Sequence, residues 1–384
     1  MLKRGIFTKK INWIIANIAD AVGFSLLNIW KRVFKYRNPE MTSIKKILVI
    51  KTDGIGDILI SLGLTRLIKK LYADSKVDYL IRPKSSGIAK MTPDINKEIQ
   101  SCSIWQDIAN VLRMRKYKYD LVISPKPQGY IFDHMLAVFV QGKHRVGYAA
   151  KGGGFLLTEV VPWQKEKRID LLMADIARLL GSAGKNEGIA LSIPSEGSIF
   201  IDKLFKASNI SDNDLKIGIN IFAGHPFIWP LGRFQEVSEK LIKNHNAKII
   251  FIGDNDHKEK VEKIRRKILF PTISFVGKTS IVQLAALIKK LDILITVDSC
   301  PRHIANAVST PAVVLRNGAN SNVIWGGYCE NEHLIFHNVP CSPCGKKICP
   351  EGKRICMTSI TVEEVLAGIN KIIHKVKEKK DIDL

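Results

Sequence analysis

The chain has 384 residues, more than the ~250–300 at which a single hydrophobic core usually divides, so we expect two domains. Its 46% hydrophobic and 25% charged residues are ordinary globular values and argue against extensive disorder. With 59 Lys and Arg against 36 Asp and Glu, the formal net charge of +23 favours polyanionic partners such as nucleic acid, acidic lipid or phosphorylated glycans. Nucleic acid is the weakest of these, because the sequence has no RNA-binding signature, zinc-finger spacing or basic helix with interleaved aromatic residues.

Residues 1–40 are predicted to form a basic amphipathic helix. Their apolar run, Ile11 to Trp30, is long enough to span a bilayer, but Asp20 within it would cost ~2.5–3.5 kcal/mol on insertion. Trp13 and Trp30 near its ends and basic residues on both flanks suit a helix lying on an anionic membrane surface. The alternative is a helix packed on the protein itself. We expect no secretory signal, because no small-residue cleavage site follows the run.

Residues 44–208 are predicted to form a first α/β domain with a parallel sheet. Lys46–Ile50, Val77–Ile81 and Asp120–Ser124 have the short β-branched character of inner strands. A helical pattern, Ile58–Tyr72, separates the first two. This alternation of strand and helix is typical of a doubly wound sheet.

The turn after the first strand reads KTDGIGD and ends at Asp57. Gly54 and Gly56 would let the backbone bend tightly and approach a ligand at the carboxyl edge of the sheet. Asp57 lies in the first turn of the next helix, where it either favours the helix dipole only or acts as a catalytic base. Leu59 replaces the third glycine of a dinucleotide fingerprint, and no G-x-x-x-x-G-K-S/T motif occurs, so neither phosphate loop is predicted.

A second doubly wound domain is predicted over residues 214–360. The stretch from Lys185 to Asp214 is rich in Ser, Asn, Gly and Asp and marks the boundary. Residues 361–384 are expected to form a C-terminal helix and tail that can pack back on this domain. We expect the two Rossmann-like domains to face each other across a central cleft. The strands expected in the second domain are 216–221, 248–252, 292–297 and 312–315.

The segment VDSCPRHIANAVSTP, Val297 to Pro311, is the second candidate site. A strand ends here and a helix begins, with Asp298 or Ser299 as its cap. Arg302 in the first turn opposes the helix dipole by ~0.3–1 kcal/mol, and a bound anion would reverse this penalty. Backbone amides at the helix start, beside Arg302 and His303, would cradle a phosphate. The alternative is a solvated arginine and a hydrogen-bonded histidine.

Four late cysteines follow the pattern C-x2-C-x4-C-x6-C. A structural zinc site favours four cysteines with close C-x2-C pairs, but the later gaps are irregular. Free thiols and disulfides are the other interpretations, and disulfides are disfavoured in the reducing cytoplasm that we expect. The four are Cys341, Cys344, Cys349 and Cys356.

Several patches together resemble glycosyltransferase family 9, the lipopolysaccharide heptosyltransferases, over about residues 45–375. They are IKTDGIGDIL, AGHPFIWPLGRF, DSCPRHIANAVSTP, Trp325 with Gly326, and the cysteine cluster. The resemblance implies a GT-B fold, with an acceptor-binding N-terminal domain and a C-terminal domain that binds a nucleotide sugar, typically ADP-heptose. It implies an inverting, metal-independent reaction without a cofactor. The implied acceptor is an anionic glycolipid, the Kdo or heptose end of a growing lipopolysaccharide core at the cytoplasmic face of the membrane, so we expect a cytoplasmic, peripheral protein.

The resemblance also assigns residues. Asp57 matches the family's catalytic base, which takes the proton of the acceptor hydroxyl. The nucleotide's ribose and base are placed near Gly253, Asp254 and Glu259, although a turn aspartate before a charged helix explains them equally. The donor-diphosphate loop is Asp298, Ser299, Cys300, Pro301 and His303, with Arg302 beside it. Further candidates for phosphate or acceptor contacts are Lys51, Thr52, Gly56, Lys126 and Arg233.

Three positions depart from the family pattern. Phe227 stands where the family usually has a lysine, so one phosphate-binding cation is missing. Cys300 replaces a common glycine, and Arg302 a small or apolar residue. Arg302 or Arg233 could replace the lost charge. The alternative function is a catalytically weakened protein on the same fold that binds a nucleotide sugar or glycan.

Overall fold

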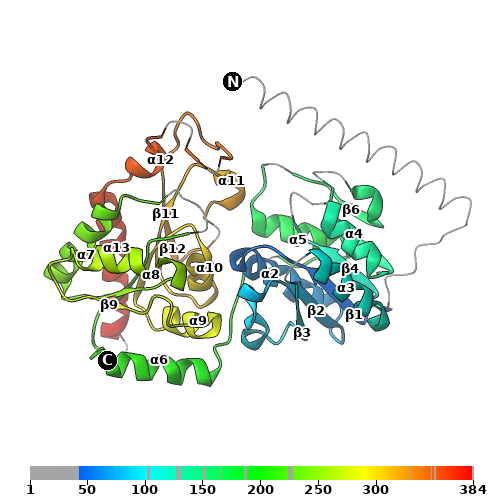
Figure 1. Cartoon of the computed structure of the whole chain (residues 1–384), viewed down its shortest axis with the longest axis horizontal. Coiled ribbons are helices and arrows are strands. Elements are labelled where there is room, and N and C mark those ends of the chain that lie inside the picture. Colours follow the sequence, from blue (N-terminus) through cyan, green and yellow to red (C-terminus); the bar gives the residue numbers. More distant parts are fainter. Residues whose placement is uncertain are drawn as a thin grey trace, which may run out of the picture. The chain divides into compact units, whose positions relative to one another are not determined.

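The computed structural model describes residues 43–382, except 102–103, 127–130, 150–152, 165, 186–187, 224–227, 328, 347 and 350–351. The chain divides into two compact units (Figure 1). Unit 1 ends at Glu187, and unit 2 begins at Gly188 and also includes Lys90–Thr92. The amphipathic helix predicted for residues 1–40 lies outside the described residues. No helix in the described ranges has both the length and the apolarity that a membrane span requires.

Unit 1 is a doubly wound sheet of six parallel strands in the order β3-β2-β1-β4-β5-β6. Its central strands are almost continuously apolar and buried, as expected for strands covered by helices on both faces. The strands are β1 (Lys46–Ile50), β2 (Lys76–Ile81), β3 (Lys97–Gln100), β4 (Leu121–Ser124), β5 (His144–Tyr148) and β6 (Glu159–Val161). The α-helices are α2 (Ile55–Leu71), α3 (Ile104–Met114), α4 (Ile131–Phe139) and α5 (Ile169–Leu179).

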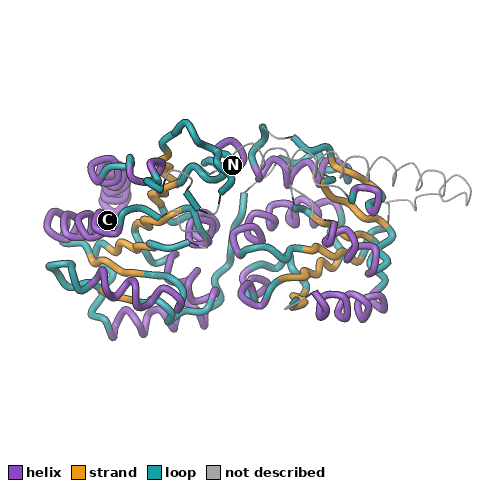
Figure 2. The backbone as a smooth tube through the Cα atoms, turned by 45° about the horizontal axis from the view of Figure 1, so that its top comes forward, coloured by secondary structure: helices purple, strands orange, loops and turns teal. Residues whose placement is uncertain are grey.

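Unit 2 repeats this architecture with the strand order β12-β11-β10-β7-β8-β9, again all parallel. In Figure 2 the orange strands of each unit run between purple helices. The prediction of two doubly wound α/β units is therefore confirmed. The strands are β7 (Lys216–Asn220), β8 (Lys248–Phe251), β9 (Ile273–Ser274), β10 (Ile293–Val297), β11 (Ala312–Arg316) and β12 (Glu332–Phe336). The α-helices are α6 (Ser195–Ala207), α7 (Leu231–His245), α8 (Lys258–Arg265), α9 (Ile281–Lys289), α10 (Cys300–Ala307), α11 (Asn322–Trp325), α12 (Ile355–Thr358) and α13 (Val362–Ile382).

The unit boundary lies earlier in the chain than the predicted end of the first domain at residue 208. Helix α6 belongs to unit 2, because it packs closely on α9: a Cβ at Gly197 would lie 3.3 Å from Val282 Cγ1. Phe205 at its C-terminal end stacks on Phe275 with ring centroids 6.2 Å apart. The polar residues that suggested the boundary lie on the exposed face of α6 and in its flanking turns. The apolar face of α6 packs into unit 2, and this packing decides to which unit the helix belongs.

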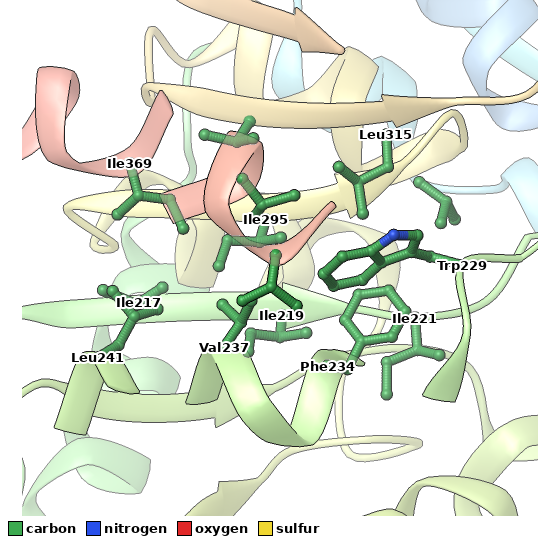
Figure 3. Close-up of a cluster of buried hydrophobic side chains, with 14 of the residues drawn as sticks. Ile217, Ile219, Ile221, Trp229, Phe234, Val237, Leu241, Ile295, Leu315 and Ile369 are labelled. Carbon is green, nitrogen blue, oxygen red and sulfur yellow. The ribbon is translucent and has the colours of Figure 1, made fainter. Parts of the chain in front are cut away.

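The C-terminal helix α13 is part of the core of unit 2. Val365 and Ile369 are fully buried in the same apolar cluster as Ile217 and Ile295 (Figure 3). Burying side chains of this size contributes roughly 1.5–3 kcal/mol each. The described part of α13 therefore packs into unit 2.

Trp229 joins the start of α7 to the segment before α13. Its indole is fully buried, lies edge-on to Phe234 with centroids 5.0 Å apart, and donates through Nε1 to the carbonyl of Ile360 at 2.9 Å (Figure 3). We predict that Trp229→Phe destabilises unit 2 by roughly 2–4 kcal/mol, since it removes this hydrogen bond and leaves a cavity. Urea unfolding measures the loss. Phe234→Leu, which breaks the ring pair and keeps the Trp229 hydrogen bond, is the comparison, and a larger loss in that variant would contradict the prediction.

Candidate active-site residues in the two units

The glycine turn of unit 1 lies at the topological switch point of its sheet. Strand order places β1 between β2 and β4, so the chain leaves the sheet in opposite directions after β1 and β4. Ligands of open α/β sheets bind at the carboxyl ends of the strands at such a point. The turn from Lys51 to Asp57 follows β1, and Lys126 follows β4, so the predicted residues of the two segments are brought together here.

Asp57 is the third residue of α2 and lies half-buried at this edge. Its carboxylate accepts a hydrogen bond from the backbone amide of Gly54, the residue that precedes the helix. Burial raises the pKa of Asp57 above its ordinary value, although Lys51 and Lys126 oppose the shift. A carboxylate whose pKa moves toward neutrality is a better proton acceptor, so the environment suits a general base.

Asp53 is the centre of the charge cluster beside Asp57. Lys51 Nζ lies 2.8 Å from its Oδ2, and Lys126 forms an ion pair with its Oδ1. Burial alone would raise the pKa of Asp53, but the charges and hydrogen bonds of the two lysines hold it below its ordinary value. The prediction that Lys51 contacts acceptor phosphate needs correction, because its side chain is 2% exposed and bound to Asp53. Thr52 and Gly56 are half-buried in the turn.

Asp133 is a further acid of this cluster, and no motif in the sequence singles it out. It lies in the first turn of α4, is buried, and has an oxygen 3.8 Å from Lys126 Nζ. Burial raises its pKa to about 6. Asp133 is distant in sequence from the glycine turn. It could have been identified only from the pairing of β1 with β4, which places the two segments at the same edge of the sheet.

In unit 2 the corresponding switch point lies between β7 and β10. Asn220, the last residue of β7, is 3% exposed, and its side-chain amide donates to Ser299 Oγ at 2.8 Å and to Thr296 Oγ1 at 3.1 Å. It thereby fixes the end of β7 to the start of α10. Sequence reasoning missed this residue, and its only signal was a polar side chain closing an otherwise apolar strand.

The start of α10 has no side-chain cap. Ser299 is the N-cap, but its hydroxyl donates to the carbonyl of Val297 and does not cap the helix. The first amides of a helix without such a cap can bind an anion. Burial, together with the charge of Arg302, lowers the pKa of His303 to about 4, so its imidazole is neutral at pH 7. Burial also raises the pKa of Cys300 to about 12, which keeps it a thiol.

Arg302 does not have the role predicted for it. Its guanidinium is fully buried and binds both oxygens of Glu332, each at 2.9 Å, with Nη1 2.7 Å from Asp298 Oδ1. It also donates to the carbonyls of Trp325 and Gly326. The predicted phosphate contact is therefore wrong for this geometry, and so is the solvated alternative. The donors of Arg302 are directed at two carboxylates and at the turn after α11.

Asp298 is the most exposed member of a buried network of four charged residues. Besides Arg302 it binds Arg316 Nη1, and both guanidiniums are 0% exposed, whereas the Asp298 side chain is 14% exposed. Burial would raise the pKa of Asp298, but the two arginines hold it below its ordinary value, so it stays ionised. With Glu332, the network contains two positive and two negative groups and is close to neutral.

The predicted contacts with the nucleotide's ribose and base, Gly253, Asp254 and Glu259, follow β8. Asp254 follows Gly253 and pairs with His257 Nδ1 at 2.6 Å, and the His257 ring stacks on Phe222 with centroids 4.6 Å apart. Glu259 is exposed on α8. These groups form an accessible rim beside the switch point, and their contact with a nucleotide remains a prediction.

The suggestion that Arg233 replaces the missing family lysine stays a prediction. Arg233 lies on α7, and its Nη1 donates to the carbonyls of Thr358 and Ile360, where it holds the segment between α12 and α13. Phe227, the position of the missing lysine, lies outside the described residues.

The four late cysteines are free thiols, so the disulfide interpretation is wrong for them. Among the described residues no group of three or more His, Cys, Asp and Glu is arranged to hold a metal ion, and the zinc interpretation stays a prediction. The thiols do lie near one another: burial raises the pKa of Cys356, and Cys341, Cys344 and Cys349 raise it further.

We predict that Cys341, which is exposed, reacts with iodoacetamide well before Cys356, which is 6% exposed. The reason is that the thiolate is the reactive form and both burial and a raised pKa suppress it. Mass spectrometry of peptides from briefly alkylated native protein measures the order. Protection of all four thiols that a chelator abolishes would instead indicate a bound metal.

Two doubly wound units, each with candidate residues at the switch point of its sheet, are the architecture of the GT-B fold. The model of glycosyltransferase family 9 (heptosyltransferase) matches residues 111–355. The chain therefore belongs to glycosyltransferase family 9.

Relatives and solved structures agree with this assignment. A lipopolysaccharide core heptosyltransferase of Haemophilus influenzae is 24% identical over 85% of this chain and 97% of its own length. Lipopolysaccharide heptosyltransferase 3 of Escherichia coli K12 is 25% identical over 83% of this chain and 95% of its own. A family 9 glycosyltransferase from Veillonella parvula has a similar fold, with a TM-score of 0.78, 22% identity and coverage of 86% and 98% of the two chains. The ADP-heptose lipopolysaccharide heptosyltransferase II of Escherichia coli gives a TM-score of 0.72 and 20% identity over 86% and 99%.

Proposed function

We propose that the protein transfers heptose or a related sugar from a nucleotide diphosphate donor, ADP-heptose, to a lipopolysaccharide core or related glycan. The observation that carries the proposal is the half-buried Asp57 at the switch point of unit 1, in a chain of this family. The lipopolysaccharide heptosyltransferases that the chain resembles support the sugar and the acceptor. The ADP-heptose heptosyltransferase II of Escherichia coli, which has a similar fold, supports the ADP-linked donor.

In the proposed reaction Asp57 takes the proton of the acceptor hydroxyl while that oxygen attacks the anomeric carbon of the donor. The bond from this carbon to the diphosphate breaks, the configuration inverts, and the nucleoside diphosphate leaves with the bonding electrons. The backbone amide of Cys300 and the neutral imidazole of His303 would donate hydrogen bonds to the charge that develops on the diphosphate. Asp298, held ionised by its arginines, would accept hydrogen bonds from donor hydroxyls. No step requires a metal ion or a cofactor.

We also propose that residues 1–40 lie on the cytoplasmic face of the membrane. The support is the basic, tryptophan-flanked apolar run, together with the net charge of +23, which favours an anionic leaflet and an anionic glycolipid acceptor.

A thermal-shift panel of ADP-, GDP- and UDP-sugars tests the donor, because a ligand that binds only the native protein raises its melting temperature. We expect ADP-heptose to give the largest shift. Transfer is then measured by mass spectrometry of a truncated lipopolysaccharide acceptor. Binding without product from any core acceptor would support the weakened binding protein instead, and selective stabilisation by a UDP- or GDP-sugar would overturn the ADP-linked donor.

A further inference from the structure

The charges at the sheet edge of unit 1 are paired unevenly. Asp53 binds both nearby lysines, Lys51 at 2.8 Å and Lys126 through its other oxygen, and Lys126 reaches on to Asp133 at 3.8 Å. Asp57, by contrast, forms no ion pair with any residue that the structure describes. Its one side-chain hydrogen bond in this part of the chain comes from a backbone amide.

This uneven pairing matters because a carboxylate bound to a cation is a poor base. A neighbouring positive charge stabilises the ionised form and lowers the proton affinity, whereas burial or a neighbouring negative charge raises it. Lys51 and Lys126 both act on Asp57 in the lowering direction, and Asp53 acts in the raising direction. A direct ion pair between Asp57 and either lysine would lower the proton affinity of the Asp57 carboxylate further.

The positions of the lysines are set by Asp53. Lys51 is 2% exposed, so its ammonium needs a carboxylate within reach, and Asp53 two residues later provides one. Lys126 lies in the loop after β4, near three carboxylates. It forms ion pairs with Asp53 and Asp133 and none with Asp57 among the described residues. The charged groups facing this cluster come from the end of β1, the glycine turn, the loop after β4, the start of α4 and the residue after β2: Lys51, Asp53, Lys126, Asp133 and Arg82.

We propose that Asp53 is a positioning residue for Asp57: it binds Lys51 and Lys126, adds its own negative charge, and so leaves the Asp57 carboxylate without a cation and basic. The inference rests on the proposed role of Asp57 as the base. It differs from a merely structural role, in which Asp53 only neutralises a buried lysine, because it predicts the direction in which the proton affinity of Asp57 changes.

The test is the pH dependence of kcat/KM in two variants of opposite charge effect. Asp53→Asn keeps the shape, removes the negative charge and releases both lysines toward Asp57, so the acid limb is expected to move to lower pH by ~1 unit. The plateau rate should fall several-fold, because the remaining base is weaker. Lys126→Met removes a cation that acts on Asp57, so its acid limb is expected to move to higher pH. Asp53→Glu should return the limb toward that of the wild type.

A loss of activity at every pH without movement of the limb, or movement in the same direction in both variants, would overturn the inference. Circular dichroism and thermal melting establish that each variant is folded. In Lys126→Met the buried Lys51 keeps its pair with Asp53, so this replacement leaves no buried lysine unpaired.

A second measurement does not depend on catalysis. The carboxyl carbon of Asp57 is titrated by NMR in protein labelled with 13C-aspartate, and the Asp57→Asn variant assigns its signal. We expect Asp53→Asn to lower the measured pKa and Lys126→Met to raise it. If these shifts occur in a protein that transfers no sugar, the electrostatic inference stands and the proposed function fails. If sugar is transferred but neither variant shifts the titration, the function stands and the inference is wrong.

Discussion

Asp57→Asn is expected to reduce sugar transfer by about 10³-fold while the protein still binds its donor. A positioned general base contributes typically ~10²–10⁴-fold, and asparagine has the same shape but cannot accept the proton. The same change is expected to raise the melting temperature. The pKa of Asp57 is raised in the folded state, so above that pKa the ionised group costs stability that a neutral amide would not. Gain of stability with loss of activity is typical of a catalytic residue whose ionised form is destabilised by its surroundings.

Asp120→Asn is the matched control for this experiment. Asp120 lies before β4, at the other end of the same sheet, and accepts hydrogen bonds from the amides of Lys45 and Lys46 and from Lys143. Burial alone would raise the pKa of Asp120, but these contacts hold the pKa below its ordinary value. The ionised form of Asp120 therefore stabilises the fold at neutral pH. Its replacement should lower the melting temperature and leave the transfer rate per folded molecule near that of the wild type. Transfer at the wild-type rate by Asp57→Asn would exclude Asp57 as the base.

The position of Asp57 could be predicted from the sequence because its signals are local. A β-branched strand, two glycines and a helical pattern follow one another within about thirty residues, and the order of strands and helices places their junction at the carboxyl edge of the sheet. Asp298 and the start of α10 could be located for the same reason. In each case the residue, its turn and its helix are neighbours in the chain.

The role of Arg302 could not be predicted, because its partners are distant in sequence. Glu332 lies 30 residues later on β12, a strand that the pattern did not indicate, and it reaches Arg302 only because β12 joins the sheet beside β11. Asn220 is similarly separated from Ser299 by 79 residues. The sequence correctly indicates that Arg302, a cation that opposes the dipole of its own helix, needs an anion nearby. That anion is the carboxylate of Glu332 and not a bound phosphate.

Glu332→Leu is expected to destabilise unit 2 by roughly 3–5 kcal/mol. The change removes the bidentate partner of a guanidinium that is 0% exposed, so one positive charge stays buried with too little compensation. Urea unfolding of the full chain measures the loss. The variant is also expected to bind the donor more weakly, because Arg302 can then draw the partly buried carboxylate of Asp298 inward. Lys290→Ala is the control, since it breaks the exposed pair with Asp202 and such pairs contribute only ~0–1 kcal/mol.

The double variant Arg302→Leu/Glu332→Leu separates the cost of an unpaired charge from the value of the pair. Removing both partners leaves no uncompensated charge between them, and Arg316 still neutralises Asp298. Buried ion pairs replaced by apolar residues of similar size often lose little stability, so the double variant should be more stable than Glu332→Leu alone. It should still bind donor poorly if the two arginines together hold Asp298 in place. If the losses of stability from the two single changes add in the double variant, the ion pair stabilises the fold directly. If the donor affinity is unchanged, the charge network does not contribute to donor binding.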